Sequence, residues 1–337
     1  MDRKGICTAG NLLVDIMYRV ERYPGRGELT SILGPREMAV GGLACNTALS
    51  LSMLDISLPI HVCGILGEDA EGQLVRTHFA RRPNIRTAGI LTGEQTSYTV
   101  VMNDQGTNER SFFVSRGSGD DFDVDDVDLD SLDVRIFHAG YVLLLAALDR
   151  EDARYGTRMA RLLAMARERG MRTSIDVVSE SGDRFRRLVP AALRHTDYCI
   201  INELEAQQIS GICLRASGTG ELLSHNMQET LHKLKRLGVA HWAAIHCPEG
   251  SFGLDEQGRY ISLPSIALPD GYIRSTTGAG DAFCAGVLYG AHEGWALLDG
   301  LRLGTATAAL SLGGADSYAT ILPVPEAMDF YRRMGGS

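Results

Sequence analysis

Short apolar runs and longer amphipathic segments alternate along most of this chain of 337 residues. Apolar runs that stop at glycine or polar positions predict buried strands, and apolar positions that repeat every three or four residues predict helices. Strands are expected at residues 5–9, 12–14, 60–66, 136–139, 173–178, 198–201 and 242–246. Helices are expected at residues 46–54, 150–169, 228–237 and 281–293.

From about Val134 onward the expected strands and helices take turns, which is typical of parallel β-α-β units with helices on both faces of one sheet. The expected fold class is therefore α/β, with a doubly wound and mostly parallel sheet. No low-complexity linker divides the chain, so we expect residues 1–330 to form a single domain. Ligands of such sheets bind beyond the carboxyl ends of the strands.

Residues 96–114 follow a different pattern, with two strand-like runs around a turn at residues 103–106. Tyr98, Val100 and Met102 share one side of the first run, and the turn composition suits a hairpin. Residues 16–38 are polar and rich in proline and glycine, which favours turns and short exposed strands. We expect these two segments to form a small β-sheet apart from the main one.

Composition narrows the class of protein. Hydrophobic residues make up 45% of the chain and charged residues 22%, which is typical of a globular protein with a buried core. The formal charge of −9 argues against a nucleic-acid-binding protein. Seven scattered cysteines without a C-x-x-C pair indicate reduced thiols and a cytoplasmic protein. No signal peptide or membrane-spanning run is expected.

Residues 120–133 contain eight aspartates. The segment lacks the glycine and the terminal glutamate of a calcium-binding EF-hand loop. A solvated turn that leads into a helix is the interpretation we favour.

The segment most informative about chemistry is the small-residue loop Ser275 to Gly280, which runs into an apolar helix. Free N–H groups at a helix N-terminus bind anions, and glycines let a phosphate approach the backbone. Asp281 follows in the first turn, where its carboxylate can accept a proton from a hydroxyl group. The alternative is an ordinary helix start at which Asp281 only stabilises the helix dipole.

Further motifs accompany this loop. Residues 277–281, Thr-Gly-Ala-Gly-Asp, resemble the second signature of the ribokinase-like carbohydrate kinase family, whose members include ribokinase, fructokinase and adenosine kinase. Residues 41–48, Gly-Gly-Leu-Ala-Cys-Asn-Thr-Ala, resemble the first signature, and Asn202 with Glu205 resembles the family's Asn-x-x-Glu motif. The resemblance runs from Gly10 to about Pro323.

The resemblance implies roles for individual residues and implies ATP and Mg²⁺ as cofactors. Asp281 corresponds to the catalytic base, and the anion hole corresponds to Gly278, Ala279 and Gly280. Residues implied to bind the substrate are Asp15, Gly41, Gly42 and Asn46. Residues implied to lie near the nucleotide or Mg²⁺, usually through water, are Asn202, Glu205, Thr277 and Gly250. No direct protein ligand to the metal is assigned.

Plainer structural roles stand beside these assignments. Asp15 could be a turn residue at a strand end, Asn46 an N-cap and Glu205 a solvated charge at a helix start. The family also has a β-sheet lid over its substrate, which corresponds here to residues 16–38 and 96–114, and many members dimerise through it. A homodimer through this lid is therefore expected.

The sequence departs from the family pattern at several positions. Ser275 replaces an aspartate that helps to form a monovalent-cation site, and because serine lacks the charge, activation by K⁺ is left open. Pro248, Glu249 and Gly250 stand where relatives commonly have Gly-x-x-Gly, so the adenine side of the site is expected to differ in shape.

The function expected is phosphorylation of a hydroxyl on a sugar or a sugar acid with ATP. Arg116, in a segment that faintly resembles 2-keto-3-deoxygluconate kinases, would meet the acid group. A nucleoside kinase and a non-catalytic binding protein of the same fold are the alternatives. A dinucleotide-dependent dehydrogenase is disfavoured because no G-x-G-x-x-G follows the first expected strand.

Overall fold

A computed structural model describes residues 4–107, 109–179 and 182–336. Its main sheet has nine strands. Seven of them run parallel to one another, and the remaining two, β14 and β15, extend one edge of the sheet in antiparallel orientation. In spatial order the strands are β15 (Tyr260–Pro264), β14 (Gly250–Leu254), β13 (Trp242–Cys247), β12 (Tyr198–Asn202), β11 (Arg172–Val177), β8 (Ile136–Val142), β1 (Ile6–Gly10), β4 (Ile60–Gly67) and β5 (Ile85–Gly93). The expected α/β fold is confirmed.

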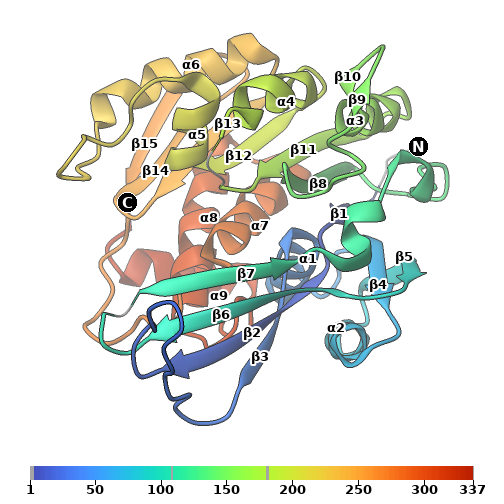
Figure 1. The fold of residues 1–337 in the computed structure, drawn as a ribbon. Coiled ribbons are helices and arrows are strands. Elements are labelled where there is room, and N and C mark those ends of the chain that lie inside the picture. Colours follow the sequence, from blue (N-terminus) through green and yellow to red (C-terminus); the bar gives the residue numbers. More distant parts are fainter. Residues whose placement is uncertain (1–3, 108, 180–181, 337) are drawn as a thin grey trace.

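Helices cover both faces of this sheet (Figure 1) and bury two hydrophobic cores. Five helices contribute to the first core: α1 (Leu43–Leu54), α2 (Ala70–Ala80), α7 (Ala279–His292), α8 (Leu297–Leu312) and α9 (Val324–Arg333). Four contribute to the second: α3 (Arg158–Glu168), α4 (Arg184–Leu193), α5 (Glu203–Ser210) and α6 (Met227–Leu237). A Cβ atom on Gly286 of α7 would lie 2.7 Å from the Cα of Gly304, so glycine lets α7 and α8 pack closely.

A separate sheet of four strands projects from this body (Figure 1). Its spatial order is β3 (Glu37–Gly41), β2 (Leu13–Val20), β6 (Ser97–Asp104) and β7 (Arg110–Ser115). We call it the lid sheet. The predicted hairpin is present as β6 and β7, and Tyr98 does share a side with Val100. That side is only half-buried, whereas Thr99 and Val101 on the opposite side are buried.

Two predicted helix starts were wrong. The helix expected from residue 150 begins at Arg158, because residues 151–157 form a small hairpin of β9 (Glu151–Asp152) and β10 (Gly156–Thr157). The Thr157 hydroxyl then caps the helix by accepting the N–H of Ala160 at 3.1 Å. The helix expected from residue 46 begins at Leu43, one turn earlier.

The aspartate-rich segment forms two 3₁₀ turns, η1 (Gly117–Asp121) and η2 (Val124–Asp126), and a third, η3 (Ser224–Asn226), precedes α6. Asp123 caps η2 and pairs with Arg158 at 2.7 Å, so part of this segment is anchored and not merely solvated. Within the described residues, no group of three His, Cys, Asp or Glu side chains is placed to hold a metal ion. Each helix that the structure describes is too short or too polar to span a bilayer.

Candidate active site

The loop before α7 has the geometry of an anion-binding site. Gly278 is the N-cap of α7 and has a φ of 77°, in the left-handed region that glycine adopts without strain. A Cβ atom there would lie 2.3 Å from the Cβ of Ser317. On Gly280 it would lie 3.2 Å from the ring of His246. Small residues therefore keep the backbone at this helix start partly exposed, as an anion hole requires, although the Ala279 N–H also donates to the Thr276 carbonyl at 3.4 Å.

Asp281 lies in the first turn of α7 and is only 4% exposed. Its Oδ2 accepts a hydrogen bond from the Asn46 side-chain amide at 2.8 Å, and the Tyr141 hydroxyl lies 2.8 Å from both carboxylate oxygens. Burial raises the pKa of Asp281 to about 6, and the bonds from Asn46 and Tyr141 lower it in part. A carboxylate that is ionised just above pH 6 suits a general base at neutral pH.

Asn46 is fixed by a partner on its other side. The Ser317 hydroxyl donates to the Asn46 carbonyl at 2.7 Å, so the amide nitrogen must face Asp281. The N-cap of α1 is Gly42, and Asn46 lies one turn inside the helix. The alternative role of Asn46 as an N-cap was therefore wrong.

The predicted substrate side meets Asp281 from the lid sheet. Asp15 on β2 is half-buried, and burial followed by repulsion from Asp281 raises its pKa to about 6, while a hydrogen bond with Thr99 lowers it. Gly41 packs on Asp15, since a Cβ atom there would lie 2.7 Å from Oδ2. A small crevice joins Asp15 to the anion-hole loop at Thr277 and to Ser317.

Asn202 and Glu205 form a capping box at the start of α5. The side-chain Oδ1 of Asn202 accepts the backbone N–H of Glu205 at 2.9 Å, and the Glu205 carboxylate accepts the backbone N–H of Asn202 at 3.0 Å. Glu205 is 4% exposed, so the alternative of a solvated charge was wrong, and burial raises its pKa to about 7. Asp176 lies nearby, and burial together with repulsion from Glu205 raises its pKa well above the usual range. Two buried carboxylates close to each other are a suitable surrounding for hydrated Mg²⁺.

A cavity of about 590 Å³ opens beside the anion hole. Its phosphate end is lined by Thr276, Ala279 and Gly280, and Asn202 and Gly250 lie on the strand side. The apolar residues that line the rest are Pro248, Ile266, Leu268, Ile273, Phe283, Ala308, Ala309 and Leu312. A largely apolar cavity that opens at a helix N-terminus has the chemistry of a nucleotide site.

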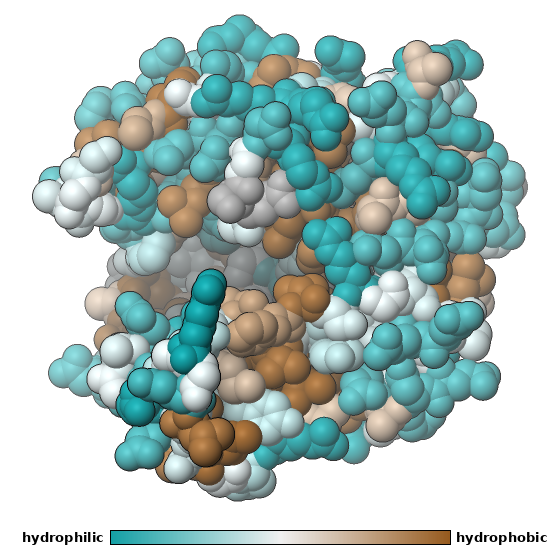
Figure 2. Space-filling model, viewed as in Figure 1, coloured by the Kyte–Doolittle hydropathy of each residue, from teal (hydrophilic) through white to brown (hydrophobic). Residues whose placement is uncertain are grey.

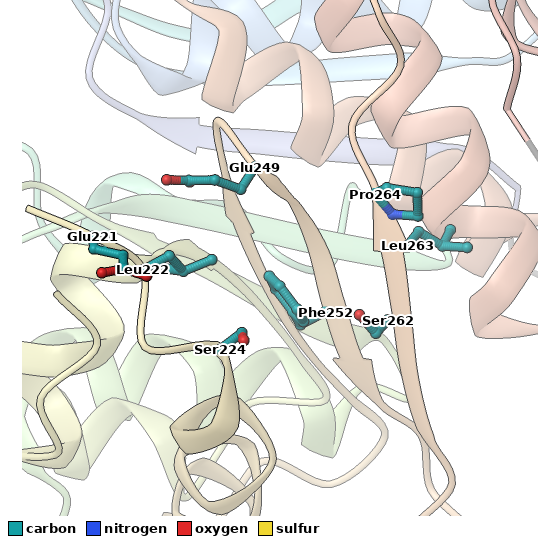
Figure 3. A pocket seen from close by; sticks show the side chains of 8 residues that line it. All are labelled: Glu221, Leu222, Ser224, Glu249, Phe252, Ser262, Leu263 and Pro264. Carbon is teal, nitrogen blue, oxygen red and sulfur yellow. The ribbon is translucent and has the colours of Figure 1, made fainter.

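A second hollow, of about 480 Å³, lies on the opposite face of β14 (Figure 3). Ser251 lines the first cavity and Phe252 the second, because neighbouring side chains of a strand point to opposite faces. None of the predicted site residues lines this second hollow. Glu249 at its edge is paired with Arg215, which also bonds Glu203 at 2.6 Å. The expected difference in shape on the adenine side stays a prediction.

Three residues of the site escaped the sequence motifs: Tyr141, Asp176 and Arg110. Arg110, at the start of β7 in the lid sheet, donates to the Thr277 hydroxyl at 3.1 Å and so reaches the phosphoryl side. Asp176 is the last residue but one of the buried strand β11, and a polar residue near the carboxyl end of such a strand is the signal that could have marked it as a site residue. Nothing in the sequence around Tyr141 or Arg110 distinguishes them from ordinary strand residues.

Comparison with known proteins agrees with this geometry. Residues 3–324 match the pfkB family of carbohydrate kinases. Ribokinase of Arabidopsis thaliana is 26% identical over 308 residues, which are 90% of this chain and 75% of the relative. 1-Phosphofructokinase of Escherichia coli is 33% identical over 100 residues, 30% of this chain and 31% of the relative. The structure of Arabidopsis ribokinase complexed with ribose and ATP superposes with a TM-score of 0.76 at 20% identity, covering 98% of this chain and 99% of the other.

Proposed function

Because this chain belongs to the pfkB family of carbohydrate kinases, we propose that it transfers the γ-phosphoryl group of ATP to a hydroxyl of an unphosphorylated sugar. The observation that carries the proposal is the placement of Asp281. Its buried carboxylate lies directly after the anion hole of Gly278 to Gly280, between the nucleotide-shaped cavity and the lid sheet. Residues 1–330 would act as one kinase domain, with the lid sheet closing over the acceptor.

The proposed reaction needs few protein groups. The acceptor oxygen attacks the γ-phosphorus, the bond from that phosphorus to the β-γ bridging oxygen breaks, and ADP leaves. Asp281 takes the hydroxyl proton and later releases it to solvent. The N–H groups of Gly278 to Gly280 stabilise the charge on the transferred group. When bound with the nucleotide, Mg²⁺ supplies positive charge to the phosphates, and Asp176 and Glu205 would hold its water shell.

The charges around the acceptor side favour a neutral substrate. Asp15, Asp316 and Ser317 line the small crevice beside the loop before α7, and the one basic side chain that we find bonded to its described lining is Arg110, at Thr277. A phosphorylated sugar would meet two carboxylates there, with Arg110 at the Thr277 end as the cation that could face it. Arg116, the residue considered for a sugar acid, pairs with Asp120 at 3.6 Å. A neutral sugar is therefore our first candidate, a sugar acid the second and a nucleoside the alternative.

The first experiment is coupled ADP release with ATP and Mg²⁺ across neutral pentoses and hexoses, sugar acids, sugar phosphates and nucleosides. We expect a neutral sugar to give the strongest signal, since it leaves no anion facing Asp15. Preference for a sugar phosphate would contradict the neutral acceptor. Silence across the panel, with sugars still raising the unfolding temperature, would favour the non-catalytic binding protein. Repeating the assay with K⁺ and with Na⁺ settles what Ser275 does to cation activation.

We also propose a homodimer through the lid sheet. β7 is an edge strand, and three consecutive residues of it are exposed: Phe112 by 60%, Phe113 by 50% and Val114 by 51%. Figure 2 shows hydrophobic side chains over this side of the molecule. An exposed apolar edge strand is a surface that proteins usually cover with another chain.

Light scattering tests this dimer. We expect twice the chain mass of 36.5 kDa for the unaltered protein and the mass of one chain for Phe113→Glu, because a buried charge without a partner opposes association. Ile56→Glu is the control, since Ile56 is 54% exposed but lies outside the lid sheet. A single-chain mass for the unaltered protein would contradict the proposal. That the protein is cytoplasmic stays a prediction.

A further inference from the structure

Tyr141 contacts the proposed catalytic base although it belongs to neither family signature. Its hydroxyl lies 2.8 Å from Oδ1 and 2.8 Å from Oδ2 of Asp281. Its side chain comes from the end of β8, and the residue is only partly buried. The phenol therefore reaches Asp281 from a different element than Asn46, which donates from α1.

The backbone that carries Tyr141 is fixed by several bonds. The Tyr141 N–H donates to the Asn11 side-chain carbonyl at 2.8 Å, and the Asn11 amide donates to the Leu144 carbonyl at 3.3 Å. Leu143 has a φ of 77°, which is unfavourable for a leucine, and its N–H and carbonyl are bonded by Asp149 and Arg184 at 3.0 Å each. These bonds hold Leu143 in a backbone conformation that leucine rarely adopts, and the turn fixed in this way sets the position of the Tyr141 phenol.

In the part of the chain that the structure describes, the other titratable groups that interact with the charge of Asp281 are carboxylates and buried thiols, which do not stabilise it. Asp15 on β2 and Asp176 on β11 are carboxylates, and Glu205 on α5 adds a further negative charge to Asp176. The neighbouring thiols of Cys45 on α1 and Cys284 on α7 are buried, and burial raises the pKa of both. Among the described residues, Asn46 and Tyr141 donate side-chain hydrogen bonds to Asp281.

We propose that Tyr141 is a positioning residue for the base: its phenol keeps the Asp281 carboxylate ionised and in one orientation, and the acceptor hydroxyl enters as a further donor. The inference rests on the proposed kinase function. Asp281 is buried among negative neighbours, so each donor that it loses makes the protonated, inactive form more favourable.

Tyr141→Phe removes the hydroxyl and leaves the ring. We expect the acid limb of the pH profile of kcat/KM for the acceptor to move up by about one to two pH units. The reason is that the free energy of one hydrogen bond to a charged group corresponds to a pKa change of about that size. Turnover at pH 6 then falls about tenfold, recovers towards pH 9, and leaves the KM for ATP unchanged. We expect the same shift of the acid limb for Tyr141→Met, which also lacks the hydroxyl.

Tyr289→Phe is the matched control: the Tyr289 hydroxyl likewise donates to an aspartate, Asp55, at 3.3 Å, and Tyr289 lies on α7, the helix of Asp281, but away from the site. An acid limb that stays in place in both Tyr141 variants, or that moves equally in Tyr289→Phe, would overturn the inference.

Thermal unfolding of the ligand-free protein gives a readout without activity. Tyr141→Phe should lose more stability at pH 8, where Asp281 is ionised, than at pH 5, and this pH dependence should vanish when Asp281→Asn is also present. An equal loss at both pH values would contradict the role of Tyr141. If no acceptor is phosphorylated by the unaltered protein, the proposed function fails, and the unfolding data still decide whether Tyr141 holds the charge of Asp281.

Discussion

Asp281→Asn is expected to lower turnover by about a thousandfold or more while ATP and the acceptor still bind. The variant keeps the shape of the side chain but cannot take the hydroxyl proton, and general-base catalysis together with positioning contributes factors of about 10² to 10⁴. The coupled ADP assay measures the loss. Near-normal turnover of Asp281→Asn would exclude Asp281 as the base.

The pH profile of the unaltered protein belongs to the same prediction. The pKa of Asp281 is about 6, so its carboxylate becomes protonated as the pH falls through 6, and activity should fall about tenfold for each further pH unit. Asp281→Asn should lose this limb from whatever activity remains.

The same substitution is expected to stabilise the ligand-free protein at pH 8. A carboxyl group whose pKa is raised on folding, here from 3.8 to about 6, contributes stability below pH 4 and loses it as the pH rises through 6. A pKa difference of roughly two between the folded and unfolded states corresponds to about 3 kcal/mol of unfolding free energy. The neutral amide of the Asp281→Asn variant avoids this cost, so the unfolding temperatures of the two proteins should differ at pH 8 and converge near pH 4.

Gly278→Ala is expected to reduce kcat by about 10² to 10³, the effect of losing an oxyanion-type donor. The added Cβ would lie 2.3 Å from the Cβ of Ser317 and 3.3 Å from the Asn46 amide nitrogen. It also meets the penalty of a left-handed conformation at φ 77°. The loop must therefore shift, and the N–H groups move away from the transferred phosphoryl group.

Gly294→Ala is the matched control for this variant. Gly294 has a φ of 72°, but a Cβ atom there would meet nothing within 4 Å. It should lose about 1 to 2 kcal/mol of unfolding free energy and keep its kcat. If Gly278→Ala retained full kcat, the backbone at Gly278 could not be part of the anion hole.

The sequence by itself determined the alternation of strands and helices and pointed to the local half of the proposed site. Strand and helix periods follow from which residues must be buried, so the order of β and α elements was predictable. The loop from Thr277 to Asp281 could also be proposed as an anion-binding site from the sequence, because the N–H groups at a helix N-terminus belong to residues adjacent in the chain. The predicted start of α3 was wrong, because the sequence before the N-cap Thr157 has the same helical pattern as the helix itself.

Only the tertiary structure decided what surrounds Asp281. Its two side-chain donors, Asn46 and Tyr141, lie 235 and 140 positions away in the chain, and Arg110 contacts Thr277 across 167 positions. Asp15 and Glu205 owe their raised pKa values to burial, which no local pattern contains. Charge and proton affinity at this site depend on which strands and helices converge, and that convergence is a property of the packed fold.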